Sequence, residues 1–279
     1  MLEKDLKALI SLLDDPDTLI YNEVKNKLIS FGDDVIPHLE NAWETSLNQL
    51  LQERIEDIIH YLQFTSIKKG LMEWKNKPNH DLIEGAILIA KYQYPDLIEA
   101  DIHSFINKLT QEIWLEVNDN LTALEKIKVL NKIIFDIHQF SGNTKNINSP
   151  QNSYINNVIE TKKGNPITLG IIYLSICEKL KIPVYGINIP AHFILAYSES
   201  QNNVLFYINV FNKGSIFFKS EIDLFLEKIE TEPKKEYYIP TDSINIIKKL
   251  IQHLVYTYDS LGYVDKKNEL IELNTILSE

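Results

Sequence analysis

His192 and Asn209 are the residues of this sequence whose types and spacing could do acid–base chemistry. They flank a polar turn at 198–203, and if that turn centres near Ser200 and Gln201, position 209 faces position 192. Same-face neighbours on paired strands are in contact, and an amide oxygen can orient a histidine ring N–H. We therefore expect the two side chains to lie within hydrogen-bond reach, directly or through one water. The alternative is a hydrogen-bonded structural histidine beside a polar turn.

The sequence offers few nucleophiles for such a histidine. Thr168 stands at the start of an apolar helix and carries a hydroxyl, but the commoner role of a threonine at such a place is to cap the helix. Ser153 is a weaker hydroxyl candidate. Cys177, the single cysteine, lies nine residues beyond Thr168, which is about half a turn round the helix and too far along it to substitute. We expect Thr168 to be either a cap or a nucleophile, and Cys177 to be a buried structural thiol.

The elements that would position these residues form an α+β fold that is mostly α. A helix over 169–181 is apolar on nearly every face, which is typical of a central buried helix. Three segments rich in Ile, Val, Phe and Tyr and bounded by Pro, Asn or Gly predict a small antiparallel sheet against it, at 184–189, 192–197 and 204–210. Helices are expected at 220–230, 241–262 and 264–277.

Residues before position 140 read as helix after helix with no strand. Apolar residues recur at helical spacing, and Asp, Gly and Pro interrupt them. The first unit resembles a HEAT repeat, because a turn at 13–17 precedes one helix and Phe31-Gly32-Asp33-Asp34 precedes another with an early proline, Pro37. Leu28 lies on its apolar stripe, and Trp43, Trp74 and Trp114 lie on others, so all four are predicted to be core residues. We expect three regions: a HEAT-like region at 1–140, a compact module at 141–232 and a C-terminal helical pair at 233–279.

Composition excludes several classes of function. The formal net charge is -11 and Arg54 is the only arginine, which argues against a nucleic-acid partner. A single cysteine and scattered histidines predict no metal site, and no phosphate loop or other cofactor motif is found. No apolar run approaches the length of a membrane span, and the N-terminus lacks an apolar signal segment. We expect a cytoplasmic protein with no cofactor and no membrane partner.

Five short segments together carry a family resemblance. In order they are Phe140-Ser141-Gly142-Asn143, Asn152-Ser153-Tyr154-Ile155-Asn156, Gly164-Asn165-Pro166-Ile167-Thr168-Leu169, Pro190-Ala191-His192-Phe193, and Asn209-Val210-Phe211-Asn212-Lys213-Gly214. Their order and spacing over about 80 residues resemble the SirB-type transglutaminase-like family. Thr168, Ala191, Asn209 and Val210 depart from that family's pattern.

The resemblance implies a core related to papain-type cysteine hydrolases. In that core a nucleophile stands at the N-terminus of a buried helix, and the next strands bring a histidine and an orienting Asp or Asn. It implies His192, Asn209 and Thr168 at the catalytic positions and Asn152, Tyr154 and Asn165 as binding residues, without the cysteine. Three functions stay open: a catalytically degenerate module that binds a protein or peptide, a hydrolase or acyltransferase with a hydroxyl nucleophile, and a helical scaffold. The missing cysteine favours the first.

Overall fold

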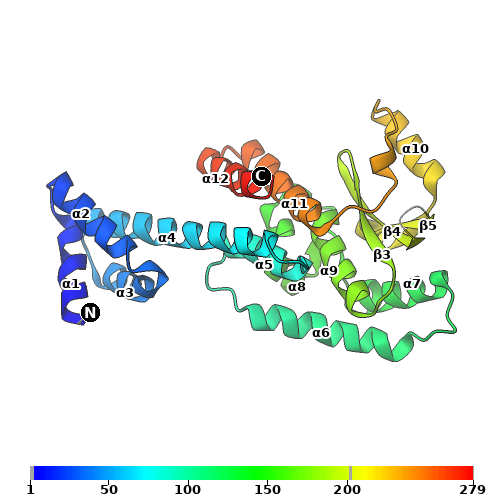
Figure 1. Ribbon diagram of the computed structural model, residues 1–279, viewed down its shortest axis with the longest axis horizontal. Helices are drawn as coiled ribbons and strands as arrows, with labels where there is room; N and C mark the ends of the chain where they lie inside the picture. The colour runs from blue at the N-terminus through cyan, green and yellow to red at the C-terminus, as the bar shows by residue number, and fades with distance from the viewer. Residues whose placement is uncertain (1–2, 201–202, 279) are drawn as a thin grey trace. The chain divides into compact units, whose positions relative to one another are not determined.

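The computed structural model describes residues 3–200 and 203–278 and divides into two compact units, Met1–Gly70 and Leu71–Glu279 (Figure 1). Within the described residues it holds twelve α-helices, a four-stranded antiparallel sheet and a two-stranded parallel pair. The expected α+β class with mostly helical content is confirmed. The boundary between the units falls inside the region 1–140, so part of that helical region belongs with the sheet.

The first unit is built from helices joined by capped turns. They are α1 (Glu3–Ser11), α2 (Thr18–Ile29), α3 (Ile36–Thr45) and the first part of α4 (Gln49–Lys75), with 3-10 turns at Leu12–Asp14 and Gly32–Val35. Asp17 caps α2 by accepting the Leu19 N–H at 2.8 Å. The guanidinium of Arg54 donates to the carbonyls of Leu13 and Asp15 and lies 4.1 Å from the centre of the Tyr21 ring. The only arginine therefore holds the turn that the Asp-Asp-Pro-Asp sequence predicts.

The core of this unit follows the predicted apolar stripes. Leu28 is fully buried in a cluster with Ile10, Leu13, Val24, Val35, Leu39, Ile55, Ile58 and Leu62. No strand occurs in the described residues up to 140, which confirms the all-helical prediction for this range. The prediction for the tryptophans is right for Trp74, which is buried, and wrong for Trp43 and Trp114, which are 39% and 67% exposed. Spacing alone does not tell which face of a helix meets a neighbour.

Leu28→Ala is expected to cost about 2–5 kcal/mol of unfolding free energy, because it removes buried methyl groups and leaves a cavity. Chemical denaturation followed by circular dichroism measures the change. Leu19→Ala on the same helix α2 is the matched control, since Leu19 is 73% exposed and its loss should change stability by less than about 0.5 kcal/mol. Equal effects of the two changes would show that the stripe is not the core.

The second unit surrounds one buried helix, α9 (Pro166–Lys179). Every residue from Ile167 to Cys177 is buried. The helix begins here because the Asn165 side chain accepts the N–H groups of Ile167 and Thr168 at 2.9 and 2.8 Å, and because Pro166 suits the first turn. Helices α5, α6 and α11 and strands β3 and β4 pack against it. The predicted central buried helix is confirmed.

The other helices of this unit are α5 (Leu82–Lys91), α6 (Glu99–Glu116), α7 (Ala123–Asn131), α8 (Ile155–Thr161), α10 (Lys219–Lys228), α11 (Ser243–Ser260) and α12 (Val264–Ile276). A π-helical segment covers Lys132–Ile137, and 3-10 turns cover Pro150–Ser153, Val210–Asn212 and Lys235–Tyr237. Helices α10, α11 and α12 lie where the sequence predicts them. Asp242 caps α11 by accepting the Asn245 N–H at 2.7 Å.

The sheet runs in the order β3 (Val184–Ile189), β4 (His192–Ser200), β5 (Asn203–Asn209) and β6 (Ser215–Phe217), all antiparallel (Figure 1). The first three strands were predicted and β6 was not. The parallel pair of β1 (Ser141–Gly142) and β2 (Lys163–Gly164) was also missed, because two-residue strands leave no periodicity. Figure 1 shows α9 and α10 beside the strands, α9 in green and α10 in orange-yellow.

The two faces of the sheet have different partners. Phe193 contacts the position of Gly170 in α9, whereas Ile194 belongs to an apolar cluster with Ile222 and Leu226 of α10. Since alternate side chains of a strand point to opposite faces, His192 shares the α10 face with Ile194. The imidazole is 4.6 Å from the ring of Phe225 in α10, which agrees with that placement.

The predicted register of the hairpin is wrong by two residues. Ile208 pairs with Leu195, so position 209 falls opposite Ile194 rather than His192. Ser200 pairs with Asn203, so the hairpin closes one residue later along the chain than predicted, which accounts for the whole shift. Gln201, half of the predicted turn centre, lies outside the described residues. Position 209 still lies on the same face as His192, because a shift of two preserves the alternation.

Candidate functional site

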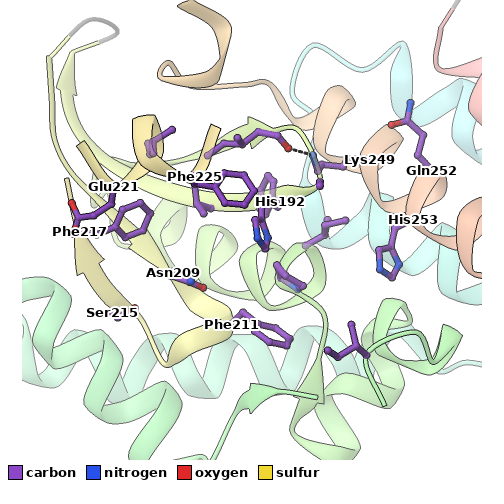
Figure 2. A pocket seen from close by; sticks show the side chains of 18 of the residues that line it. His192, Asn209, Phe211, Ser215, Phe217, Glu221, Phe225, Lys249, Gln252 and His253 are labelled. Atoms are coloured by element: carbon purple, nitrogen blue, oxygen red, sulfur yellow. Dashed lines mark hydrogen bonds between the residues drawn. The ribbon is translucent and has the colours of Figure 1, made fainter. Parts of the chain in front are cut away.

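A cavity of about 950 Å³ opens beside the sheet, and His192 lies in its wall (Figure 2). The start of α9 contributes Pro166 and Ile167, the strands contribute His192 and Asn209, and helices α10 and α11 supply the opposite walls. Most of the lining is apolar, and polar groups occur at intervals along it. Its aromatic members are Phe193, Phe211, Phe217, Phe225 and Tyr256.

His192 and Asn209 share this cavity without bonding to each other in the described structure. The Asn209 Oδ1 accepts the N–H of Asn212 at 3.2 Å and so closes the turn after β5. Burial, and then the positive charge of Lys249, lower the pKa of the His192 imidazole, so the ring is neutral at pH 7. A contact between them through one water therefore stays a prediction.

The N-terminus of α9 presents no nucleophile to the cavity. Asn165 takes the capping role that was predicted for Thr168, so that prediction is corrected. The Thr168 side chain is fully buried, and its Oγ1 has no hydrogen-bond partner among the described residues. Cys177 is buried as predicted, and burial raises the pKa of its thiol well above the ordinary value. The side chains that reach the cavity from this helix are Pro166 and Ile167.

Lys249 of α11 brings a positive charge to the cavity. Its Nζ donates to the Ile189 carbonyl at 2.8 Å and to the Asn188 side-chain oxygen, which fastens α11 to the end of β3 (Figure 2). Burial lowers the pKa of the ammonium from its ordinary 10.5 to about 8. The amine therefore remains mostly protonated at pH 7, and its two oxygen acceptors favour the charged form.

His253 of α11 belongs to a buried polar group that the sequence did not predict. The Ser153 Oγ accepts from the Asn165 side-chain amide at 2.8 Å and lies 3.2 Å from the His253 Nδ1. The Asn165 amide nitrogen, which can only donate, also lies 3.5 Å from Nδ1, so we assign Nδ1 as an acceptor and the ring proton to Nε2. Burial followed by the charge of Lys249 lowers the His253 pKa, so this ring is also neutral at pH 7.

The match to known families decides the identity. Residues 100–252, more than half of the chain, match the transglutaminase-like superfamily. The chain belongs to that superfamily. The resemblance carried by the five sequence segments is therefore confirmed, and the match includes α9, the sheet and the cavity-lining part of α11 up to Gln252.

Relatives of this transglutaminase-like protein are bacterial and animal. A UPF0162 protein of Xylella fastidiosa (strain Temecula1) is 32% identical over 127 residues, which cover 44% of this chain and 45% of that protein. A UPF0162 protein of Vibrio cholerae is 26% identical over 132 residues, covering 47% and 48%. F-box only protein 21 of Mus musculus is 23% identical over 235 residues, covering 74% of this chain and 36% of that protein. The chain spans less than half the length of the curated relatives it matches. No solved structure matches significantly.

The three predicted binding residues, Asn152, Tyr154 and Asn165, are buried and form hydrogen bonds within the protein. Asn152 is buried, and its amide donates to the carbonyls of Asn146 and Ile147 at 2.7 and 3.1 Å. Tyr154 is buried, with its hydroxyl 2.9 Å from that of Tyr258. Asn165 is the α9 cap described above. None of the three lines the cavity, so each shapes the site through its neighbours.

The residues of the transglutaminase-like site that sequence reasoning missed come from α11. Lys249, Gln252, His253 and Tyr256 all line the cavity, and their spacing of i, i+3, i+4 and i+7 places them on one face of the helix. That spacing was visible in the sequence as a polar stripe on an otherwise apolar helix. Among the described residues, no helix is both long and apolar enough to cross a bilayer, and no cluster of acidic, His or Cys side chains is suited to a metal.

Proposed function

We propose that this transglutaminase-like protein binds a protein or peptide segment in the cavity and does not catalyse a reaction on it. One observation carries the proposal. The N-terminus of α9, where a cysteine hydrolase of this kind would hold its nucleophile, offers the cavity only the side chains of Pro166 and Ile167.

The placement of His192 supports the same conclusion. Its ring packs against Phe225 on the α10 face of the sheet, away from the face on which Phe193 meets α9. A general base must lie within hydrogen-bond reach of the proton it removes. The two hydroxyls near the start of α9 do not meet this condition, because Thr168 is buried outside the lining and Ser153 bonds with His253 instead.

The helical region 1–140 raises the alternative that the whole chain is a scaffold. Its capped turns and short helices favour a HEAT-like arrangement, and repeats of that kind commonly offer extended binding surfaces. A purely structural scaffold would need no cavity with polar groups set in an apolar wall. The cavity therefore favours a binding role for the module over a scaffold role for the whole chain.

Two measurements test the proposal. A broad panel of amide and ester substrates is incubated with the wild type and with His192→Ala, and neither is expected to exceed the uncatalysed rate. Turnover by the wild type that disappears in His192→Ala, with the fold retained by circular dichroism, would overturn the proposal in favour of a hydroxyl-dependent hydrolase or acyltransferase.

The second measurement concerns binding. A pool of fluorescein-labelled peptides is titrated with the full chain and followed by anisotropy. Ser215→Trp places a bulky ring on the cavity wall and is expected to weaken binding at least about tenfold. Ser220→Trp, on the exposed surface of α10 and outside the lining, is the matched control and should bind like the wild type. Equal binding by both variants would place the partner elsewhere.

A further inference from the structure

The cavity contains a positive charge that no acidic side chain neutralises. The Lys249 Nζ donates to two neutral oxygens, those of Ile189 and Asn188, and forms no ion pair within the described residues. An ammonium has three donors, so one N–H remains for a ligand. A half-buried cation that lacks a carboxylate partner is costly to the fold unless an anion binds there.

The neutral imidazoles of His192 and His253 interact electrostatically with the Lys249 ammonium. His192 of β4 and Lys249 and His253 of α11 line the same cavity, so the three groups face it from two walls, and the charge of Lys249 lowers the pKa of both imidazoles. The Asn165 amide donor beside Nδ1 leaves the proton of His253 on Nε2, which can donate to a ligand. An ammonium flanked by two N–H donors is suited to the two oxygens of a carboxylate.

The rest of the cavity fits an apolar chain that also carries amide groups. Ile189, Ile194, Ile222 and Phe225 supply apolar wall, and the single acidic residue of the described lining, Glu221, is occupied by accepting the Phe218 N–H at 2.8 Å. Figure 2 shows Glu221 beside Phe217, across the cavity from Lys249.

Amide and hydroxyl side chains are also set in that wall, namely Asn148, Asn209, Ser215 and Gln252. A hydrocarbon tail cannot form hydrogen bonds with these side chains, whereas the N–H and C=O groups of a peptide backbone can.

We infer that the cavity captures the free C-terminus of a peptide, with its α-carboxylate at Lys249 between His192 and His253 and its last apolar side chains against the walls. The inference rests on the proposed binding function and names the end of the partner that is recognised. Capture of a terminal carboxylate explains why a half-buried cation in the lining has no acidic partner within the described residues.

The test compares two forms of one peptide pool on the full chain. Fluorescein-labelled tetrapeptides with apolar last two residues are prepared with a free carboxylate or with a carboxamide. The free acids are expected to bind at least about tenfold more tightly, because a charge-assisted hydrogen bond is lost in the amide. Equal affinities would overturn the inference and leave the binding function standing. Competition by dodecanoate with no binding of the acid peptides would assign the site to a fatty acid and overturn it as well.

Variants on α11 identify the group responsible. Lys249→Met is expected to reduce the preference for the acid over the amide to less than about threefold, while Lys248→Met, the adjacent lysine outside the cavity lining, retains it. Thermal unfolding checks that Lys249→Met is folded, and the wild-type comparison of acid with amide stands without any variant. Retention of the full preference in folded Lys249→Met would refute the assignment.

The pH dependence of the preference for the acid peptide distinguishes a ligand-binding lysine from a purely structural one, since the titration of a structural lysine would not change that preference. A bound carboxylate raises the Lys249 pKa above its free value of about 8, so the preference for the acid is constant well below pH 8 and falls as the pH rises from about 8 through the raised value. His192 and His253 titrate below that window, and Glu221 on α10 faces the opposite end of the cavity. A preference that stays constant up to pH 10 would contradict the role of Lys249.

Discussion

In the folded protein, Cys177 is expected to react with iodoacetamide at least a thousandfold more slowly than in the denatured chain. The thiol is fully buried in α9, and burial raises its pKa, so the reactive thiolate is scarce as well as inaccessible. Reaction then requires opening of the core, which costs most of the roughly 5–15 kcal/mol of global stability.

Mass spectrometry of samples quenched over time, with and without guanidinium chloride, measures the two rates. Leu47→Cys provides an internal control, because Leu47 is fully exposed and a cysteine there should react at the free rate in the same folded sample. A catalytic thiol shows the reverse behaviour, since its activation depends on the fold. A native Cys177 that reacts as fast as the cysteine at position 47 would mean that α9 is misplaced and that the case against thiol chemistry fails.

Gly170→Val is expected to destabilise the protein by at least about 4 kcal/mol or to prevent folding. A Cβ at Gly170 would lie 2.5 Å from the Phe193 ring, and both residues are buried between α9 and β4. Valine adds three carbons where none fits, and overpacking of this kind outweighs the better helix propensity of the new residue. Glu178→Val on the exposed end of α9 is the matched control and should cost less than about 1 kcal/mol.

A double-mutant cycle identifies the contact responsible. Phe193→Ala alone should cost about 3–5 kcal/mol as a core truncation. Together with Gly170→Val it should cost about 1–3 kcal/mol less than the sum, because the ring that clashes is gone. Additive free energies of unfolding, measured by denaturation, would show that the two positions do not touch.

The sequence predicted the elements of the fold better than their pairing. Strand β3 was predicted at its observed bounds, and α9 was expected to be buried, because hydrophobic patterns are local properties of the chain. The register of β4 against β5 depends on where the hairpin closes, and a run of polar residues such as 198–203 does not mark that point to within one residue. The burial of Trp114 was predicted wrongly for a related reason. Periodicity places a residue on the apolar face of a helix but does not show whether another element packs against that face.

The candidate site was half predictable. His192 and Asn209 both line the cavity, because a hairpin is a local structure and an error of two in its register leaves both side chains on the same face. Lys249 and His253 were missed because α11 reaches the cavity only through tertiary packing, far along the chain from β4. Thr168 was assigned the role of Asn165, since both are good caps and only the backbone geometry decides which one the helix uses.

The bond from Lys249 to the end of β3 also bears on how this module can be divided. The same helix that anchors the β3–β4 turn supplies the wall bearing His253 and Tyr256. The superfamily match ends at residue 252, inside α11, although the helix continues to Ser260. A fragment cut at the end of the match would keep the ammonium and lose the imidazole four residues beyond it. The smallest piece that preserves the chemistry of the cavity therefore extends past the matched region, to the end of α11.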